Sequence, residues 1–459
     1  MHTPFVSPQV DTGAVVQIIQ TYAPAAELCA WSDVVGASSL SQGVMAHATN
    51  ATHATNAVHG APLSRDDVAG AFAQFPFVAA PMASVSDKSY RIVNECAGAG
   101  FAYSEMVSVA GLHYDSDKTW DLICPSDVEK PLVVQLFGSK PDQFRAAAAR
   151  IAERLSGRLL FFDVNMACPV AKVTKKGEGS ALMCTPKKAA AIVRALCAET
   201  SVAVTCKIRR GYELGNETAS EFARVLEDAG AAAITVHGRY AKQLYSGNSC
   251  DACIERVARA ISVPTIASGD ILTPERACTL ASLPGVAGVM IARGTYGNPW
   301  IFSDAYRLFS QQQGTTHDSA SYGGGDSAAA DELTDVPADA SRTAPSRRSY
   351  LARLAAMRLS VHLLAAHGSH MARARSIMSW YLAAFPHAKS WRARFMTCKT
   401  LSDFLACINE LEATVCASDA AALAIGDKHA GTNADTNAAQ PGVDSSHTSA
   451  YLGLSHERL

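Results

Sequence analysis

The stretch FFDVNMACPVAKVTKKGEGSALM, residues 161–183, joins a mostly apolar run to a polar loop that carries a cysteine before a proline. The run Phe161–Val164 is typical of a parallel strand that is covered on both faces. Further runs that we expect to form strands, FAYSEM (residues 101–106) among them, alternate along the chain with helix-like stretches such as 141–155 and 185–199. Together they make eight strand–helix units, which predict a (β/α)8 TIM barrel rather than a doubly wound sheet.

Composition bounds the class of protein. The chain has 459 residues, 48% of them hydrophobic, and a formal net charge of −2, so it can build a large barrel and a second domain. No apolar run approaches the roughly 20 residues that span a bilayer, and the first residues lack the pattern of a signal peptide. We therefore expect a cytoplasmic protein with no membrane partner, whose 13 scattered cysteines stay reduced.

Shifts in composition predict five parts of the chain. Segments rich in small and polar residues, including an HATNA-type repeat near the N-terminus, are typical of chain without a fixed fold. The expected parts are an N-terminal extension, partly of low complexity, over 1–74, the barrel over 75–310, a disordered linker over 311–347, a small C-terminal helical domain over 348–415 and a disordered tail over 416–459.

Polar residues finish nearly every predicted strand. In a (β/α)8 barrel the functional groups lie at the C-terminal ends of the strands. A single polar residue at the end of a strand commonly caps a helix or makes a hydrogen bond in a loop. Polar residues after nearly every strand instead predict that they share one site. The residues are Pro81, Met82, Ala83, Glu105, Gln135, Asn165, Cys168, Lys207, His237, Ser268, Gly269, Asp270 and Arg293.

The loops after the last two predicted strands favour a phosphate site. ASGDI (267–271) and IARGTYGNP (291–299) supply small residues, backbone N–H groups and an arginine where such barrels often bind phosphate. Lys207 and Gln135 would then serve a flavin, which needs a cation or donor near the end of its ring that gains negative charge on reduction. His237 could contact the ribityl phosphate, although a hydrogen-bonded core histidine is the simpler interpretation.

Several segments also stand in the order and spacing of a known family. They are APMASVSDKSYR, SEMVS, VQLFGSKP, FDVNMACPVAKV, KIRRGY, ITVHGR, SGDI and MIARGTYGNPWIF, within residues 77–302. This set resembles the flavin-dependent tRNA-dihydrouridine synthases. After the predicted linker, ARSIMSWYLAAFPHAKSWR is similar to the small helical C-terminal domain of the same family, most like its bacterial B-type branch.

The resemblance implies a barrel that binds FMN and reduces the carbon 5–carbon 6 double bond of particular uridines in tRNA with electrons from NADPH or NADH. It implies that Cys168 gives a proton to carbon 5 while reduced FMN gives hydride to carbon 6. A thiol with a pKa of about 8.5 is mostly protonated at neutral pH, which suits that role. Asn165 would hold the uracil edge or the flavin, because an amide is both donor and acceptor.

The resemblance also implies which residues bind FMN. Those expected at the ring are Pro81, Met82, Ala83, Gln135 and Lys207, and those expected around the phosphate are His237, Ser268, Gly269, Asp270, Ala292 and Arg293. Three residues depart from the usual family pattern: Ala167, Ser268 and Ala292 stand where glycine, asparagine and glycine are usual. The methyl group of Ala292 narrows the approach to the phosphate, so FMN affinity is the property that we expect it to change.

Cations outside the barrel strands predict contacts with RNA. Lys172, Lys175 and Lys176 are either solvated charge or contacts to the tRNA backbone, and the sequence leaves both interpretations open. The helical segment 347–399 is rich in arginine and lysine, Arg375 among them, and its interleaved aromatic residues more simply pack the helices together. We therefore expect tRNA as the partner of a monomer.

No metal site is expected. The pair Cys250 and Cys253 has the spacing of half a zinc site, but no second pair with suitable spacing follows it.

Two other functions stay open at this point. An FMN barrel that reduces a free pyrimidine would share much of the barrel, but would usually carry asparagine where this chain has Val170. It would also have no use for a basic helical domain. A non-catalytic RNA-binding protein would need neither a flavin site nor Cys168.

Overall fold

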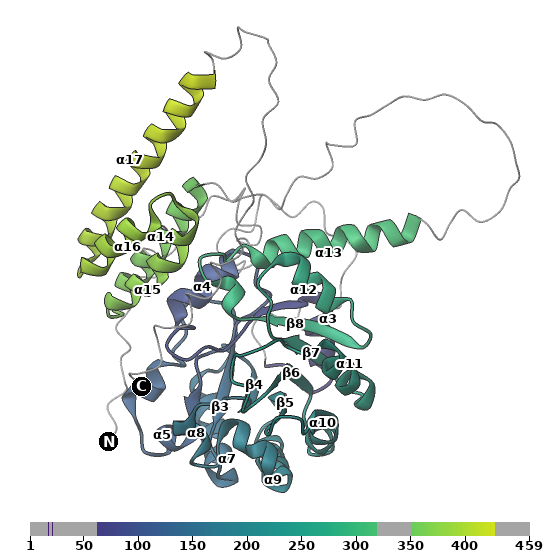
Figure 1. Ribbon diagram of the computed structural model, residues 1–459. Helices are drawn as coiled ribbons and strands as arrows, with labels where there is room; N and C mark the ends of the chain where they lie inside the picture. The colour runs from purple at the N-terminus through teal and green to yellow at the C-terminus, as the bar shows by residue number, and fades with distance from the viewer. Residues whose placement is uncertain (1–16, 18–20, 22–61, 319–349, 427–459) are drawn as a thin grey trace, which may run out of the picture. The chain divides into compact units, whose positions relative to one another are not determined.

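The computed structural model describes residues 62–318 and 350–426, together with Gln17 and Thr21 (Figure 1). The HATNA-type repeat, the predicted linker beyond Asp318 and the predicted tail beyond Gly426 lie outside the described residues. Two compact units divide the chain, Met1–Glu412 and Ala413–Leu459, and the barrel belongs to the first.

Eight parallel strands form the barrel, which confirms the predicted fold. They pair in the order β1-β8-β7-β6-β5-β4-β3-β2. Parallel bridges from Ala79 to Ala102 and from Tyr103 to Val133 join β1 to β3 and close the ring. The strands are β1 (Phe77–Ala79), β2 (Val107–Ser108), β3 (Leu132–Phe137), β4 (Leu159–Met166), β5 (Val204–Gly211), β6 (Ala233–Tyr240), β7 (Thr265–Ser268) and β8 (Val286–Ile291).

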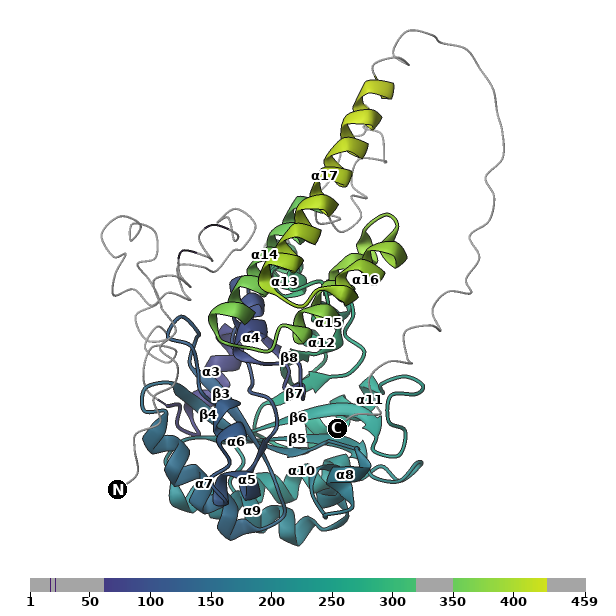
Figure 2. The same ribbon diagram turned by 90° about the vertical axis from the view of Figure 1, so that its left-hand side faces the viewer.

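Helices cover the outside of the strands, where α7, α9 and α10 lie in both Figure 1 and Figure 2. Short polar side chains start several of the helices: Asp87, for example, accepts a hydrogen bond from the N–H of Tyr90 in α4, and Thr273 accepts one from the N–H of Arg276 in α12. The helices are α3 (Asp67–Gln74), α4 (Lys88–Cys96), α5 (Val109–His113), α6 (Asp117–Asp121), α7 (Pro141–Arg154), α8 (Ala171–Thr174), η1 (Gly179–Cys184), α9 (Pro186–Glu199), α10 (Ala219–Asp228), α11 (Asp251–Ala260), α12 (Pro274–Ala281), η2 (Arg293–Thr295) and α13 (Ile301–Asp318).

Residues 62–74 pack against the N-terminal ends of the strands. Leu63 donates its N–H to the carbonyl of Leu160 at 2.8 Å and accepts the N–H of Ala203 at 2.7 Å. Phe72 of α3 is fully buried in the barrel core. The C-terminal part of the predicted extension therefore belongs to the barrel, because its apolar side chains cover the end of the core.

The helices α14 to α17 form the C-terminal helical region. Phe395 and Phe404 stack there with ring centroids 6.3 Å apart, and Leu354 and Met378 are fully buried beside other apolar side chains. Most of its aromatic residues thus pack the helices together. The elements are α14 (Tyr350–Ala366), α15 (Ala372–Tyr381), η3 (Leu382–Ala384), α16 (Ala388–Thr397) and α17 (Leu401–Gly426).

Two helices run past the boundaries that composition suggested. The helix α13 continues to Asp318, beyond the predicted start of the linker at residue 311, and α17 continues to Gly426, beyond the predicted end of the helical domain at residue 415. The α17 extension is rich in alanine, which favours helix, whereas the α13 extension begins with three glutamines and then carries Gly314, Thr315 and Thr316, which do not. Composition alone therefore placed both helix ends too early.

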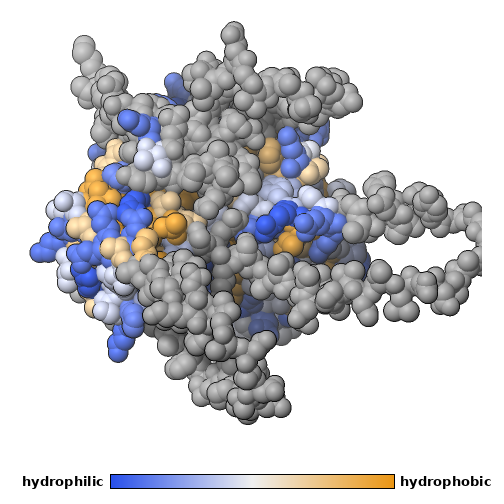
Figure 3. All heavy atoms as spheres, turned by 90° about the horizontal axis from the view of Figure 1, so that it is seen from above, coloured by the Kyte–Doolittle hydropathy of each residue, from blue (hydrophilic) through white to orange (hydrophobic). Residues whose placement is uncertain are grey.

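The surface that Figure 3 colours by hydropathy carries hydrophilic residues interspersed with small hydrophobic patches. Among the described helices, none combines the length and the apolar character needed to cross a membrane.

Candidate active site

Three neighbouring strands each carry two polar residues two positions apart. They are Asp163 and Asn165 on β4, Lys207 and Arg209 on β5, and His237 and Arg239 on β6. The strand register sets Asn165 beside Lys207 and Arg209 beside His237. Because residues i and i+2 of a strand point to the same face, these six side chains share the face away from the helices, and all six are buried.

A chain of hydrogen bonds connects the barrel interior to the cysteine loop. Gln135 on β3 donates its Nε2 to Asp163 Oδ2 at 2.7 Å and accepts Asn165 Nδ2 on its Oε1 at 2.8 Å. Asn165 Oδ1 in turn accepts the backbone N–H groups of Ala167 at 3.1 Å and Cys168 at 2.9 Å. The two buried amides therefore fix each other and the start of the loop.

Further contacts hold Cys168 in place. Its carbonyl accepts the N–H of Ser180 at 3.0 Å, and Arg209 Nε donates to the carbonyl of the preceding Ala167 at 2.8 Å. Gly179 has a φ of +59°, and a Cβ atom there would lie 2.8 Å from the carbonyl oxygen of Cys168, so the loop closes on a glycine. Burial raises the pKa of the Cys168 thiol despite the nearby cations Arg209 and Lys207. The thiol is therefore protonated at neutral pH.

Two further groups of the barrel interior have displaced pKa values. Burial raises the pKa of Asp163 to about 6, although Thr205 and Gln135 donate hydrogen bonds to the carboxylate. Burial lowers the pKa of Lys207 to about 8, and the neighbouring Arg209 lowers it further against the attraction of Asp163. Between these two pKa values, Asp163 is an anion and Lys207 is a cation.

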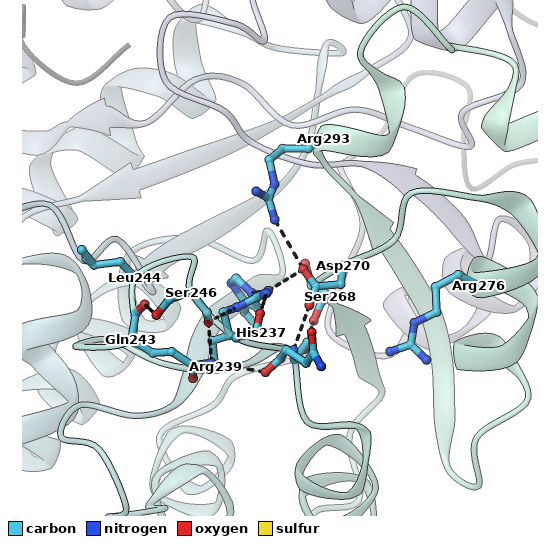
Figure 4. Close-up of polar contacts among 12 residues, drawn as sticks. His237, Arg239, Gln243, Leu244, Ser246, Ser268, Asp270, Arg276 and Arg293 are labelled. Atoms are coloured by element: carbon cyan, nitrogen blue, oxygen red, sulfur yellow. Dashed lines mark hydrogen bonds and ion pairs between the residues drawn. The ribbon is translucent and has the colours of Figure 1, made fainter. Parts of the chain in front are cut away.

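Asp270 connects the loops that follow β6, β7 and β8. Figure 4 shows Arg239 and Arg293 pointing toward its carboxylate, with Arg239 Nη1 at 2.6 Å and Arg293 Nη2 at 3.4 Å from Oδ1. Its Oδ2 accepts the N–H of Ser249 at 2.8 Å. Although burial opposes it, the hydrogen bonds from Arg239 and Ser249 hold the pKa of Asp270 below its usual value. The carboxylate is therefore an anion that orients both arginines.

His237 lies beside this arginine pair. Its Nε2 is 3.4 Å from Arg239 Nη1. Burial and the surrounding cations, Lys207 and Arg209 first among them, hold the pKa of His237 well below its usual value. The imidazole is therefore neutral and can donate a hydrogen bond at one ring nitrogen and accept one at the other.

The cations that lack full pairing fit the charges of FMN. Lys207 is only 9% exposed, yet the described residues give its ammonium group no hydrogen-bond partner. The Arg293 side chain is 38% exposed, and its contact with Asp270 is long. Gly269, with a φ of +114°, lies so close to His237 that a Cβ atom on residue 269 would be 2.7 Å from His237 Cδ2. A buried ammonium for the ring and a guanidinium beside a small-residue turn for the phosphate suit this cofactor.

Comparison with known proteins decides the family. The family model described as dihydrouridine synthase (Dus) matches residues 78–421, which include the Cys168 loop and most of the helical region. This chain belongs to the dihydrouridine synthase family. The tRNA-dihydrouridine synthase B of Pseudomonas putida is 32% identical over 318 residues, which cover 69% of this chain and 86% of that protein. The tRNA-dihydrouridine synthase B of Shewanella oneidensis is 37% identical over 227 residues, which cover 50% of this chain and 70% of that protein.

A probable tRNA-dihydrouridine synthase 1 of Synechocystis is 38% identical over 231 residues, which cover 50% of this chain and 64% of that protein. The names of these relatives agree with the resemblance seen in the sequence motifs, and those of Pseudomonas and Shewanella agree with its B-type branch. The predicted family is therefore confirmed.

The other predicted FMN residues of this dihydrouridine synthase lie in the loops around the same end of the strands. Pro81, Met82 and Ala83 belong to the β1–α4 loop (residues 80–87), in which Met82 donates its N–H to Ser86 Oγ at 2.9 Å. Ser268 ends β7, and Ala292 and Arg293 open the β8 loop (residues 292–300). Gln135 is fully buried with both ends of its amide engaged, so its contact with the ring stays a prediction.

The predicted RNA-binding residues lie outside this buried set. Lys172, Lys175 and Lys176 are exposed on and after α8, the helix that follows the Cys168 loop. Arg375 donates both Nε and Nη2 to the carbonyl of Cys398, so it braces α15 against the end of α16. A role of these four side chains in binding RNA stays a prediction.

Sequence analysis missed Asp163, Arg209 and Arg239 as site residues. A signal was present, since each stands two positions from a predicted site residue on the same strand. The role of a polar residue inside an apolar run depends on which residues of the neighbouring strand lie beside it. A single sequence does not show this, because it does not reveal the strand register.

Within residues 62–318 and 350–426, no three or more histidine, cysteine, aspartate or glutamate side chains lie together in a way that could hold a metal ion. Cys253 is fully buried in α11, one turn away from the half-buried Cys250.

Proposed function

We propose that this protein reduces the carbon 5–carbon 6 double bond of particular uridines in tRNA to dihydrouridine, with FMN as cofactor and NADPH or NADH as reductant. The observation that carries the proposal is the position of Cys168: Asn165 holds its backbone N–H, and burial raises the pKa of its thiol, at the same end of the barrel as Lys207 and the Arg239–Arg293 pair. An acid, a ring-binding cation and a phosphate site are what this reduction needs.

The cofactor would be held by residues on six of the barrel strands and in the loops that follow them. When bound and reduced, FMN supplies the hydride that carbon 6 of uracil receives. Lys207 would face the ring, since its buried ammonium has no hydrogen-bond partner among the described residues, although Asp163 attracts it. The residues proposed for the rest of the cofactor are Pro81, Met82, Ala83 and Gln135 at the ring and His237, Ser268, Gly269, Asp270, Ala292 and Arg293 at the phosphate.

Cys168 would move the proton. The bond between Sγ and hydrogen breaks as carbon 5 gains its hydrogen, and the thiolate that remains is stabilised by the positive charges of Arg209 and Lys207, which already lower its pKa against burial. Proton uptake from water then restores the thiol. Asn165 would position both the thiol loop and the uracil edge, because its remaining amide hydrogen is available.

RNA would reach this site with its target base out of the helical stack, because a stacked base cannot enter a barrel. The exposed cations Lys172, Lys175 and Lys176 border the Cys168 loop and would contact the phosphate backbone. We assign a second contact to the helical domain, over residues 348–415 and with Arg375 in it. The monomer is the proposed active form, since one chain carries every group named above, and the proposed location is the cytoplasm.

A competition experiment tests this function. The protein is incubated with NADPH, a tRNA transcript that lacks modified bases, and free uridine and uracil in excess. Mass spectrometry is expected to find dihydrouridine in the tRNA and unchanged free pyrimidines. Reduction of the free pyrimidines with intact tRNA would make the protein a free-pyrimidine dehydrogenase. A protein that binds tRNA but no FMN would be an RNA-binding protein without this activity.

A further inference from the structure

The β1–α4 loop is held by a glutamate that is itself held from the helical region. Ser84 in this loop has a φ of +61°, which an L-residue seldom adopts, and its N–H donates to Glu105 Oε2 at 2.5 Å. The other carboxylate oxygen of Glu105 lies 3.2 Å from Arg373 Nη2 on α15. The strained Ser84 is thus held by the Glu105 carboxylate, and Arg373 from a distant part of the chain orients that carboxylate.

Arg373 also contacts the far end of the same loop. Its Nε lies 2.9 Å from Asp87 Oδ2, while Asp87 Oδ1 caps α4 by accepting the N–H of Tyr90 at 2.8 Å. The side chains of Asp87 and Glu105 are only 13% and 9% exposed, so water competes little for these carboxylates. One guanidinium therefore joins the two residues that fix the β1–α4 loop in its conformation.

An independent contact links the helical region to the β8 loop. Tyr296 stacks on Trp380 of α15 with ring centroids 4.1 Å apart and an angle of 4° between the planes. Gly297 has a φ of +64°, and a Cβ atom there would lie 2.5 Å from the carbonyl of Trp380. Arg353 of α14 donates to the carbonyl of Gly297 at 2.8 Å. Two of the loops that carry predicted FMN residues, the β1–α4 loop and the β8 loop, are thus held by contacts from α15, and the β8 loop also contacts α14.

We propose that Arg373 is a positioning residue for the cofactor, which makes the helical region a structural part of the FMN site as well as a candidate RNA-binding domain. This inference rests on the proposed function in one respect, that the cofactor is FMN. Arg373 acts through Glu105 and Asp87, because neither its Nε nor its Nη2 is directed to a predicted FMN residue. Loss of the guanidinium is expected to loosen residues 81–84 and to leave the hydrogen bonds around Cys168 unchanged.

The test is FMN binding by the full chain without RNA. Arg373→Met is titrated with FMN, and flavin fluorescence and the visible absorption spectrum of the bound flavin are recorded. We expect about tenfold weaker binding and a changed spectrum, because two charge-assisted contacts of the loop are lost. Arg373→Lys keeps the charge and is expected to restore part of the affinity.

Arg358→Met is the matched control, since Arg358 also bridges two acceptors, Asn409 Oδ1 at 2.6 Å and Glu412 Oε2 at 2.7 Å, but both lie in the helical region. The control is expected to bind FMN as the wild type does. Wild-type affinity and spectrum in Arg373→Met, or equal losses in Arg358→Met, would overturn the proposal.

If Arg373→Met does not fold, a second variant tests the positioning role of Arg373. Glu105→Gln keeps an acceptor for the Ser84 N–H but removes the ion pair with Arg373. It is expected to weaken FMN binding in the same direction, and unchanged FMN binding in this variant would count against the proposal. A wild-type protein that binds no FMN would instead refute the proposed function, so the two failures are distinguishable.

Discussion

Asn165 Oδ1 accepts the backbone N–H of Cys168 at 2.9 Å, so the residue expected to hold the substrate also holds the loop of the proposed proton donor. The same amide donates to Gln135, and Gln135 donates to Asp163. The position of the thiol is therefore set from inside the barrel, through buried amides that have few alternative orientations.

Replacing Asn165 by alanine removes the acceptor for two loop N–H groups. We expect proton transfer to uracil to slow by about 100-fold, because a small displacement of the acid is enough to do so, while FMN stays bound. Rapid mixing of the reduced protein with tRNA measures this rate. Asn94→Ala is the control, since Asn94 is equally buried but donates to the carbonyl of Tyr90 within α4. A similar loss of rate in both variants would mean that the effect is general destabilisation.

Asp163→Asn is expected to change how stability depends on pH. Burial raises the pKa of Asp163 from 3.8 to about 6. The contribution of this group to the free energy of unfolding is therefore fully present below the unfolded pKa of 3.8 and is lost as the pH rises through the folded pKa of about 6. The variant cannot ionise, and Thr205 can turn its hydroxyl to the Phe162 carbonyl, 3.3 Å away. Relative to wild type, its free energy of unfolding should increase by about 2 kcal/mol between roughly pH 4 and pH 7. Denaturant titrations at both pH values test this, and a difference independent of pH would contradict it.

Lys207 is expected to make FMN affinity dependent on pH. Burial, with Arg209, lowers the pKa of its ammonium group to about 8, so the cation is lost as pH rises through that value. The dissociation constant of FMN should therefore increase above about pH 8 in the wild type. Lys207→Met should bind FMN more weakly at neutral pH and show no such increase. An identical pH profile in the two proteins would assign the titration to another group.

Gly269→Ala tests the turn proposed for the phosphate. The added Cβ would lie 2.5 Å from Ser249 Oγ and 2.7 Å from His237 Cδ2. Gly215 is the matched control, because its φ of +76° is also positive but no atom lies within 4 Å of its Cβ position. Backbone strain costs each variant roughly 1–2 kcal/mol of stability, and crowding affects only Gly269→Ala. We expect FMN to bind more weakly to Gly269→Ala alone, with riboflavin, which lacks the phosphate, less affected; equal FMN binding by both variants would contradict the assignment.

Much of the barrel could be predicted because strands such as β4 and β6 are buried along their whole length and so appear as apolar runs. The segment FAYSEM was expected to form a regular strand, but it makes single bridges at Ala102 and Tyr103, and β2 begins only at Val107. Residues 102–103, which close the barrel, pair with β1 on one side and with β3 on the other. The sequence of the segment alone does not determine these pairings, because the partners lie elsewhere in the chain.

The candidate site was predictable where a chemically distinctive residue stands on a strand or just after its end, as with Lys207 on β5 and Cys168 after β4. Asp163 and Arg209 were missed because their roles come from contacts across strands, to Gln135 and to the Ala167 carbonyl. Arg373 was beyond prediction for the same reason, since Glu105 precedes it by 268 residues.

The most direct test of the account is the rate at which tRNA reoxidises the flavin in the wild type and in Cys168→Ala. Each protein is loaded with FMN, reduced by NADPH without oxygen and mixed with unmodified tRNA, and flavin absorbance is followed. We predict that both proteins bind FMN and are reduced alike, and that the variant is reoxidised at least about 100-fold more slowly because carbon 5 lacks its acid. Reoxidation of Cys168→Ala at the wild-type rate, with dihydrouridine formed, would contradict the assignment of Cys168 as the proton donor.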